Sequence, residues 1–353
     1  MTISSQAAAG GADPAGGGPS GPAPGPPGGA SVTKEPAGKE LAGRSPRQLM
    51  WRRFRRDRAG VVAGCVVVFF CAVAALAPVI SWLYGKDPYT TYGLSRPELL
   101  DPVTGYPMKP NGGIDGEFWF GLEPGLGRDV LTQLVYGIRT SLLIGLAATI
   151  LSTLTGIIVG VTAGYLGGRT DYFLGRLIDL LLSFPQQLFF VAFMPVLTVL
   201  FVSDDEETPT WFRVIALISV LWLLGWMQLA RLLRGQVLSL REREFVEAAR
   251  VTGASPWRII RKELLPNLGT PIMVQATLML PMFVTTEAGL SFLGVGVVQP
   301  TPDWGRMFAK GAEVYEGDIT YMVFPGVAMV VFVVAFNLLG DSVRDAMDPK
   351  TSR

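Results

Sequence analysis

The residues best suited to chemistry lie in a polar stretch, residues 247–266, between two long apolar segments. This stretch reads EAARVTGASPWRIIRKELLP and is too polar to cross a membrane. Arg243, Glu247 and Arg250 are spaced to pair at i,i+4 and i,i+3 on one surface of a helix expected over about 236–252. A charged helix held between membrane segments predicts binding to another protein in water.

A sharp corner is expected after this helix. Gly253 permits the left-handed conformation that commonly ends a helix, and Ser255 followed by Pro256 fits an N-cap and the first position of a second helix. Ile259 should point away from three apolar residues that share one side of that second helix: Trp257, Ile260 and Leu264. Such a helix needs two neighbours, of which its own bundle supplies one. A loop whose tryptophan lies at the lipid headgroups fits the periodicity equally well.

The composition excludes several kinds of site and favours a membrane protein. The 353 residues include no histidine, which removes imidazole bases, histidine metal ligands and histidine-assisted nucleophiles. Cys65 and Cys71 lie inside the first apolar segment, where packing as small hydrophobes is favoured over a disulfide. Hydrophobic residues make up 49% and the mean hydropathy is +0.38, while a net charge of +1 gives no argument for nucleic acid. We therefore expect no metal and no cofactor on this chain.

Six apolar runs predict an all-α polytopic membrane protein with six transmembrane helices. The runs cover about residues 59–84, 140–165, 172–202, 211–233, 268–290 and 321–340. Seven arginines between residues 44 and 58 precede the first run, and acidic residues outnumber basic ones in the segment 85–127. Under the positive-inside rule both termini and the polar stretch lie in the cytoplasm.

These features divide the chain into five parts. The expected parts are a disordered Gly-, Pro- and Ala-rich cytoplasmic tail (1–43), a basic segment with the first transmembrane helix (44–84), an extracytoplasmic loop and lead-in (85–139), a core of five transmembrane helices that includes the cytoplasmic loop 236–266 (140–345), and a cytoplasmic C-terminus (346–353). The tail is expected to be disordered because it holds too few large apolar side chains to offset its ordering entropy.

Glu287 is the sharpest candidate for a translocation path, because it lies inside the fifth apolar run. A charge at mid-bilayer costs roughly 2.5 to 3.5 kcal/mol and normally faces a partner or a wet cavity. A place near the outer end of its helix, hydrated or hydrogen-bonded around Thr285 and Thr286, explains the residue equally well.

Two further polar residues are weaker candidates for the path. Asp179 is expected to pair with Arg176, one turn back on the same helix. Gln186 and the next glutamine follow Pro185, which predicts a kink whose freed carbonyls need partners. Helix packing is therefore the favoured role for Gln186 and Gln187.

The polar stretch resembles the EAA loop of bacterial ABC import permeases. Glu-Ala-Ala at 247–249 is followed after three residues by Gly253 and then by Leu265 and Pro266, while Glu263 stands where the family has isoleucine. Three further segments look like the second membrane subunit of dipeptide, oligopeptide and nickel importers: GLGRDVLTQLVYGIRTSLLIG, DLLLSFPQQL and TTEAGLSFLGVGVVQPTPDWGRM. The resemblance touches nearly all of residues 45–350, although Glu-Pro at 123–124 replaces the usual Thr-Asp.

The resemblance implies a type I ABC importer permease fold (MetI-like) and a multi-pass, non-catalytic subunit that translocates di- or oligopeptides across the bacterial cytoplasmic (inner) membrane. The implied partners are a homologous second permease subunit in a heterodimer, two cytoplasmic nucleotide-binding ATPase subunits, an extracytoplasmic substrate-binding protein and membrane lipid. ATP and Mg would be bound by the partner ATPase subunits, since this chain has no phosphate-binding P-loop motif.

The resemblance also assigns residues to ATPase coupling. Glu247 would hold the corner through Arg243 or Arg250, Gly253 would form it, and Trp257 would fill the partner's pocket. The full set expected to couple is Glu247, Ala248, Ala249, Gly253, Ser255, Pro256, Trp257, Ile260, Leu265 and Pro266.

Three other functions remain open from the sequence. A nickel-chelate importer permease shares these motifs. A secondary transporter driven by an ion gradient would need paired intramembrane charges and broken helices at matching places in two halves, and the sequence shows neither. A membrane scaffold without transport would predict nothing special about the polar stretch.

Overall fold

The computed structural model describes residues 46–201 and 209–347. Within these ranges the chain consists of helices and loops, with two isolated β-bridges. The all-α prediction is therefore confirmed for the part of the chain that the structure describes. The predicted disordered tail (1–43), the acidic run 204–207 and residues 348–353 lie outside the described residues.

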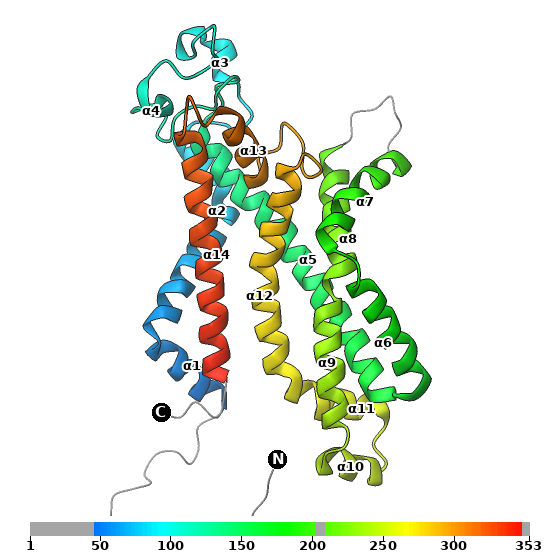
Figure 1. Ribbon diagram of the computed structural model, residues 1–353. Helices are drawn as coiled ribbons and strands as arrows, with labels where there is room; N and C mark the ends of the chain where they lie inside the picture. Colours follow the sequence, from blue (N-terminus) through cyan, green and yellow to red (C-terminus); the bar gives the residue numbers. More distant parts are fainter. Residues whose placement is uncertain (1–45, 202–208, 348–353) are drawn as a thin grey trace, which may run out of the picture. The chain divides into compact units, whose positions relative to one another are not determined.

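The first group of helices runs in the order α1 (Pro46–Arg56), α2 (Arg58–Tyr84), α3 (Tyr92–Ser95), η1 (Pro97–Leu99), α4 (Pro110–Gly113), α5 (Val130–Leu166), α6 (Gly168–Leu182) and α7 (Gln186–Phe201). After residues 202–208 follow α8 (Thr210–Gly225), α9 (Met227–Leu240), α10 (Glu244–Val251), α11 (Pro256–Ile259), η2 (Ile260–Leu264), α12 (Leu265–Phe292), α13 (Trp304–Val314) and α14 (Thr320–Met347). Figure 1 shows these elements in chain order by colour.

Five helical segments among the described residues are long and apolar enough to cross a membrane. They are Arg58–Tyr84, Val130–Leu166, Thr210–Leu240, Pro256–Phe292 and Thr320–Met347. Helices α6 and α7 form a further candidate that is bent by 86° at a short break. Pro185 stands in this break, as the predicted kink requires. The six predicted spans thus correspond to five helical segments and one bent pair.

Helix α5 organises the packing, since it contacts α9, α12, α2 and α8. Asp129 caps its start by accepting a hydrogen bond from the backbone N–H of Thr132 at 2.7 Å. Glycines at 156, 160 and 164 lie against α9, and a Cβ on Gly160 would come within 2.5 Å of the carbonyl oxygen of Ala230. These small residues therefore let the backbones of α5 and α9 approach closely.

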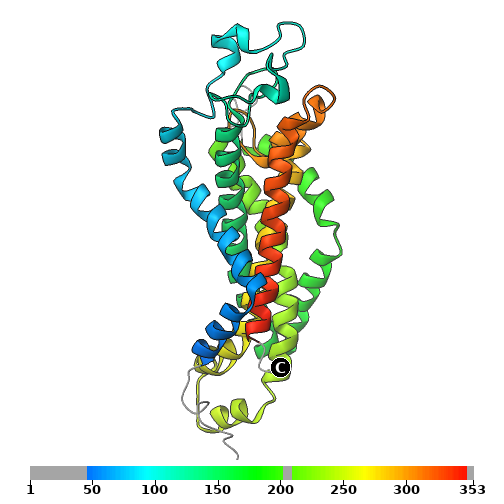
Figure 2. The same cartoon turned by 90° about the vertical axis from the view of Figure 1, so that its left-hand side faces the viewer.

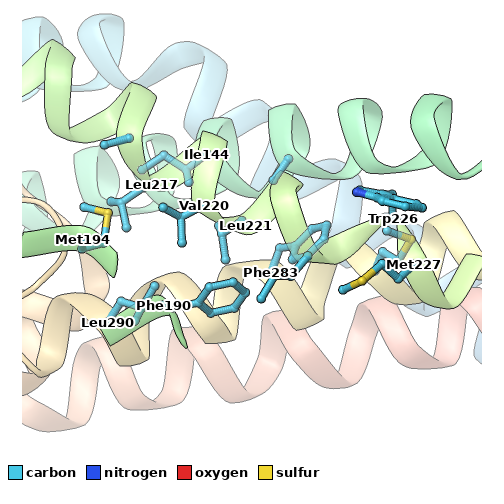
Figure 3. Close-up of a cluster of buried hydrophobic side chains, with 14 of the residues drawn as sticks. Ile144, Phe190, Met194, Leu217, Val220, Leu221, Trp226, Met227, Phe283 and Leu290 are labelled. Carbon is cyan, nitrogen blue, oxygen red and sulfur yellow. The ribbon is translucent and has the colours of Figure 1, made fainter. Parts of the chain in front are cut away.

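Three apolar clusters fill the bundle. Figure 3 shows one of them, in which side chains of α5, α7, α8 and α12 meet, including Ile144, Phe190 and Leu221. A second joins α2, α5, α13 and α14, where the ring of Phe70 packs edge-on against Trp304 and Phe332. Helices α2 and α14 lie side by side in Figures 1 and 2. The third cluster lies under the polar stretch of residues 247–266.

The segment between α2 and α5 carries α3, η1 and α4 and lies at the opposite end of the spanning helices from α10 and α11 (Figure 1). Glu117 joins parts of this segment by accepting hydrogen bonds from Arg96 at 2.6 Å and Lys86 at 3.3 Å. The Arg96 guanidinium and the Lys86 ammonium hold the pKa of Glu117 below its usual value.

Candidate functional site

The corner between α10 and α11 forms as the residue types predict. Gly253 adopts φ +78°, and its N–H donates to the carbonyl oxygen of Arg250 at 2.9 Å. The hydroxyl of Ser255 then accepts a hydrogen bond from the N–H of Arg258 at 3.4 Å, and Pro256 occupies the first turn of α11. The predicted corner at Gly253 and the Ser255 cap are confirmed, but the helix predicted over about 236–252 is wrong as a single element, since residues 241–243 separate α9 from α10.

The side of the corner that faces the bundle is buried. Val246, Ile259 and Leu264 are fully buried and pack in one cluster with Val237 of α9 and Val161 of α5. Burial of these apolar side chains anchors both short helices to the spans beneath them.

The prediction that Ile259 points away from a side shared by Trp257, Ile260 and Leu264 is wrong. Residues Ile260–Leu264 form a π-helix, in which side chains five positions apart align instead of those three or four apart. Ile259 and Leu264 therefore share the buried face, while Ile260 is half-buried and Trp257 turns outward.

The outer surface of the corner is apolar and exposed. Trp257 is 67% exposed and Val251 is 84% exposed, one on each side of Gly253. Within the described residues the chain therefore leaves its largest aromatic side chain at this tip uncovered. These two apolar side chains at the tip are accessible for contact with another molecule.

The charges around the corner do not pair as predicted. Among the described residues Glu247 is exposed and forms no ion pair with Arg243 or Arg250. The guanidinium of Arg250 instead lies 5.7 Å from the centre of the Tyr165 ring, and Arg241 donates to the carbonyl oxygen of Gly164 at 3.1 Å. The corner is therefore attached to the end of α5 by arginines, a connection that the spacing of charges along one helix could not reveal.

The other residues expected to couple lie around this surface. Ala248, Ser255, Pro256 and Pro266 are exposed, while Ala249 and Leu265 are half-buried against the cluster under the corner. The roles of these residues in coupling stay a prediction.

The corner is connected to two spans without a flexible link. Helices α11, η2 and α12 run on as one helical segment, Pro256–Phe292, and only residues 241–243 separate α9 from α10. The corner is therefore joined directly to α12 and through three residues to α9.

Asp179 pairs with a different arginine from the one predicted. It accepts a hydrogen bond from Arg231 on α9, whereas Arg176 lies over the ring of Tyr172. Two further residues missed by the sequence analysis reinforce this contact, because Arg234 on α9 makes two hydrogen bonds to Asp171 on α6, at 2.5 and 2.9 Å. Their only sequence signal was their position at the ends of neighbouring spans.

A groove of about 470 Å³ lies between α7, α12 and α14. Gln187, Thr285, Thr286 and Asn337 line it together with apolar side chains, and none of its lining residues is ionisable. Gln186 points elsewhere, since its side-chain amide donates to the carbonyl oxygen of Leu224 at 3.3 Å. The favoured packing role thus has a structural basis for Gln186, whereas Gln187 lines the groove.

Glu287 does not line this groove, although its two neighbours do. Its side chain is completely buried, and its Oε1 accepts a hydrogen bond from Ser291 at 3.1 Å. The hydroxyls of Thr285 and Thr286 donate to carbonyl oxygens of their own helix, each at 2.8 Å. Glu287 thus lies near the end of its helix, as the alternative expects, but it is buried instead of hydrated and is not bonded to these threonines. The place of Glu287 on a translocation path stays a prediction.

Comparison with known proteins identifies relatives over nearly the whole described chain. A family model described as "Binding-protein-dependent transport system inner membrane component" matches residues 156–353. A second model, described as "N-terminal TM domain of oligopeptide transport permease C", matches residues 45–102.

Three curated relatives illustrate the similarity. The oligopeptide transport system permease protein OppC of Escherichia coli is 34% identical over 311 residues, which cover 88% of this chain and 93% of OppC. The dipeptide transport system permease protein DppC of Bacillus subtilis is 34% identical, with 86% and 85% covered. The glutathione transport system permease protein GsiD of Salmonella paratyphi A is 35% identical, with 87% and 91% covered.

Proposed function

Because the chain belongs to the family of binding-protein-dependent transport system inner membrane components, we propose that it is a permease subunit of an ATP-driven importer that carries peptides across the bacterial cytoplasmic membrane. The names of the relatives support the cargo, since all three cited permeases serve oligopeptides, dipeptides or glutathione.

The observation that carries the ATPase coupling is the exposed apolar tip of the corner. Trp257 and Val251 project from a segment whose underside is buried, so the tip is rigid and its apolar surface lacks a cover from the described chain. A cytoplasmic ATPase subunit with an apolar cleft fits this surface. Two such subunits bind the ATP and Mg, while this chain hydrolyses nothing.

Movement at the corner changes the groove. Closure of the ATPase subunits on ATP displaces the corner, and the continuous segment Pro256–Phe292 transmits the displacement to α12. Since α12 forms one wall of the groove with α7 and α14, its shift alters the width of the groove. A homologous second permease covers the open side, so that the two grooves form one path.

The groove suits peptides because its polar groups are neutral. Side-chain amides and hydroxyls can exchange hydrogen bonds with peptide N–H and C=O groups, whatever the charge of the peptide side chains. An extracytoplasmic binding protein then selects the cargo and delivers it at the end of the bundle that carries α3 and α4. Both termini and the corner lie in the cytoplasm on this proposal.

Replacement of Trp257 tests the docking surface. In an importer purified through a tag on this subunit, Trp257→Ala should reduce the recovered ATPase subunit at least about tenfold, because a central interface tryptophan contributes about 2 kcal/mol or more. Trp82→Ala is the matched control, since Trp82 is 78% exposed at the far end of α2. Equal recovery of the ATPase from both variants would contradict the proposal.

A further inference from the structure

A group of charged side chains is buried at the outer ends of α5, α12, α13 and α14. Glu123 and Arg128 precede α5, Glu287 belongs to α12, and Asp303 and Arg306 belong to the start of α13. The first four are at most 3% exposed, and Arg306 is half-buried. Buried charges in such a setting must be neutralised by one another or by bound ions.

Two of these residues neutralise each other. Arg128 forms a bidentate ion pair with Glu123, in which Nε donates to Oε2 at 2.5 Å and Nη2 donates to Oε1 at 2.8 Å. The side-chain amide of Gln133 also donates to Glu123 at 3.3 Å. Glu123 and Arg128 thus form a complete ion pair that leaves the other three charges to be balanced.

Glu287 and Asp303 each have one satisfied and one unsatisfied oxygen. Ser291 donates to Oε1 of Glu287, and the N–H of Gly305 donates to Oδ1 of Asp303 at 2.7 Å. Oε2 of Glu287 and Oδ2 of Asp303 accept no hydrogen bond among the described residues, and the hydroxyl of Ser141, which faces Glu287, is itself unpaired. The two carboxyl groups face each other where α12 packs against α13, since Gly305 of α13 lies directly against Ala288 and Ser291 of α12. Two ionised carboxylates can only accept, so this contact becomes a hydrogen bond when one of them carries a proton.

The net charge of the whole cluster also calls for one proton on the Glu287 and Asp303 pair. Three carboxyl groups and two guanidinium groups share the cluster, and Arg306 stays charged even though burial and nearby Arg128 lower its pKa. The remaining groups that face the pair are neutral: Ser141 of α5, Ser291 of α12 and Tyr321 of α14. One proton on the Glu287 and Asp303 pair therefore makes the whole cluster neutral.

A metal or alkali cation would need room that the site lacks. The cavity beside Asp303, lined by Arg128, Arg306 and Tyr321, has a volume of about 10 Å³. That volume is at the lower limit for a single water molecule. A proton needs no cavity and supplies the missing donor.

We propose that Glu287 and Asp303 form a buried proton-binding site, which holds one shared proton and joins α12 to α13 at the outer end of the bundle. The packing around the site leaves little space for the pair to separate, since a Cβ on Gly305 would lie 2.1 Å from the carbonyl oxygen of Ala288. This proposal does not depend on the proposed function.

The direction of the pH effect follows from burial, which raises the pKa of Asp303 to about 6. The folded protein therefore keeps a proton that the unfolded chain releases above its ordinary carboxyl pKa near 4. Stability is then greatest at acidic pH and falls as pH rises through the range in which the folded pair titrates.

Infrared spectroscopy of the full chain in lipid nanodiscs tests the shared proton directly. Wild-type protein at about pH 5, below the pKa of Asp303, should show the carbonyl band of a buried protonated carboxyl group. The band should disappear in Glu287→Gln and in Asp303→Asn, which keeps an N-cap residue at the start of α13. It should persist in Glu313→Gln, because the Glu313 side chain is 67% exposed and lies outside the pair.

A melting series from about pH 5 to about pH 8 supplies the second measurement. The melting temperature of the wild type should fall with rising pH more steeply than that of Glu287→Gln, whose amide supplies the donor permanently. A band that survives both substitutions would overturn the proposal. Stabilisation of the wild type, but not of Glu287→Gln, by sodium over choline would also overturn it, since the site would then hold a cation.

Discussion

Gly253 is the residue on which the corner depends. Its φ of +78° is a conformation that β-branched residues adopt only with strain, of about 1–2 kcal/mol. A Cβ there would meet nothing within 4 Å, so any effect of a side chain comes from the backbone and not from a clash. Because a side chain at Gly253 would act through backbone strain alone, a substitution there tests the geometry of the corner.

We expect Gly253→Val to leave the protein in the membrane but to uncouple ATP hydrolysis from transport, because the strained corner presents Trp257 at a changed angle. Gly253→Asn is the matched control, since asparagine tolerates the left-handed conformation. Reconstituted importers should show lost transport and lost substrate-stimulated ATPase activity with valine, and near-normal values with asparagine. Unchanged transport and stimulation in the valine variant would refute the role of the corner.

Spacing along one helix does not decide which partner a charged side chain binds. Arg176 is one turn from Asp179, yet Asp179 binds Arg231 of a neighbouring helix. Arg250 is close in sequence to Glu247 but lies over Tyr165. An i,i+3 pair at the surface contributes only about 0.2–0.5 kcal/mol, so a partner from another helix readily replaces it.

At the scale of elements, the π-helical turn at Ile260–Leu264 connects the corner to α12 without a break. It lets Ile259 and Leu264 point into the bundle together and turns Trp257 outward. A regular α-helical period assigns these side chains to different faces, which explains the wrong prediction for Ile259.

The contact between α5 and α9 depends on small residues. We expect Gly160→Val to destabilise the protein by about 1–3 kcal/mol, because the new side chain meets the α9 backbone at Ala230. Gly269→Val is the control, since a Cβ on Gly269 meets nothing within 4 Å. Thermal melting of both variants in detergent should separate them, and equal melting temperatures would contradict the close-packing role.

At the scale of the whole molecule, the groove joins three helices that are distant in sequence. A cross-link across it tests whether its width must change in transport. Gln187→Cys on α7 with Asn337→Cys on α14 places two thiols on the groove lining, in a chain whose exposed Cys65 and Cys71 are replaced by serine. A bifunctional thiol reagent should stop transport, while ATPase subunits still bind the corner.

The control for this cross-link is Met282→Cys with Thr286→Cys, which places both thiols on the groove side of α12 alone. A link within one helix does not restrain the groove, so transport should continue. Full transport in the α7 to α14 cross-linked protein would show that the groove keeps its width.

The sequence by itself determined the spans, the corner and the family. Apolar runs of membrane length, the left-handed preference of Gly253 and the capping of Ser255 and Pro256 are local properties, which each segment carries wherever it packs. The EAA stretch and the three further segments carried the resemblance for the same reason.

Only the tertiary structure decided which side chains meet across helices. The rotation of each helix about its own axis is set by packing against several neighbours, as where the glycines of α5 pack against α9. That rotation brought Arg231 to Asp179 and enclosed Glu287 with Asp303, sixteen positions further along the chain and beyond a loop. No helical period relates such residues, so their contact could not be predicted from spacing.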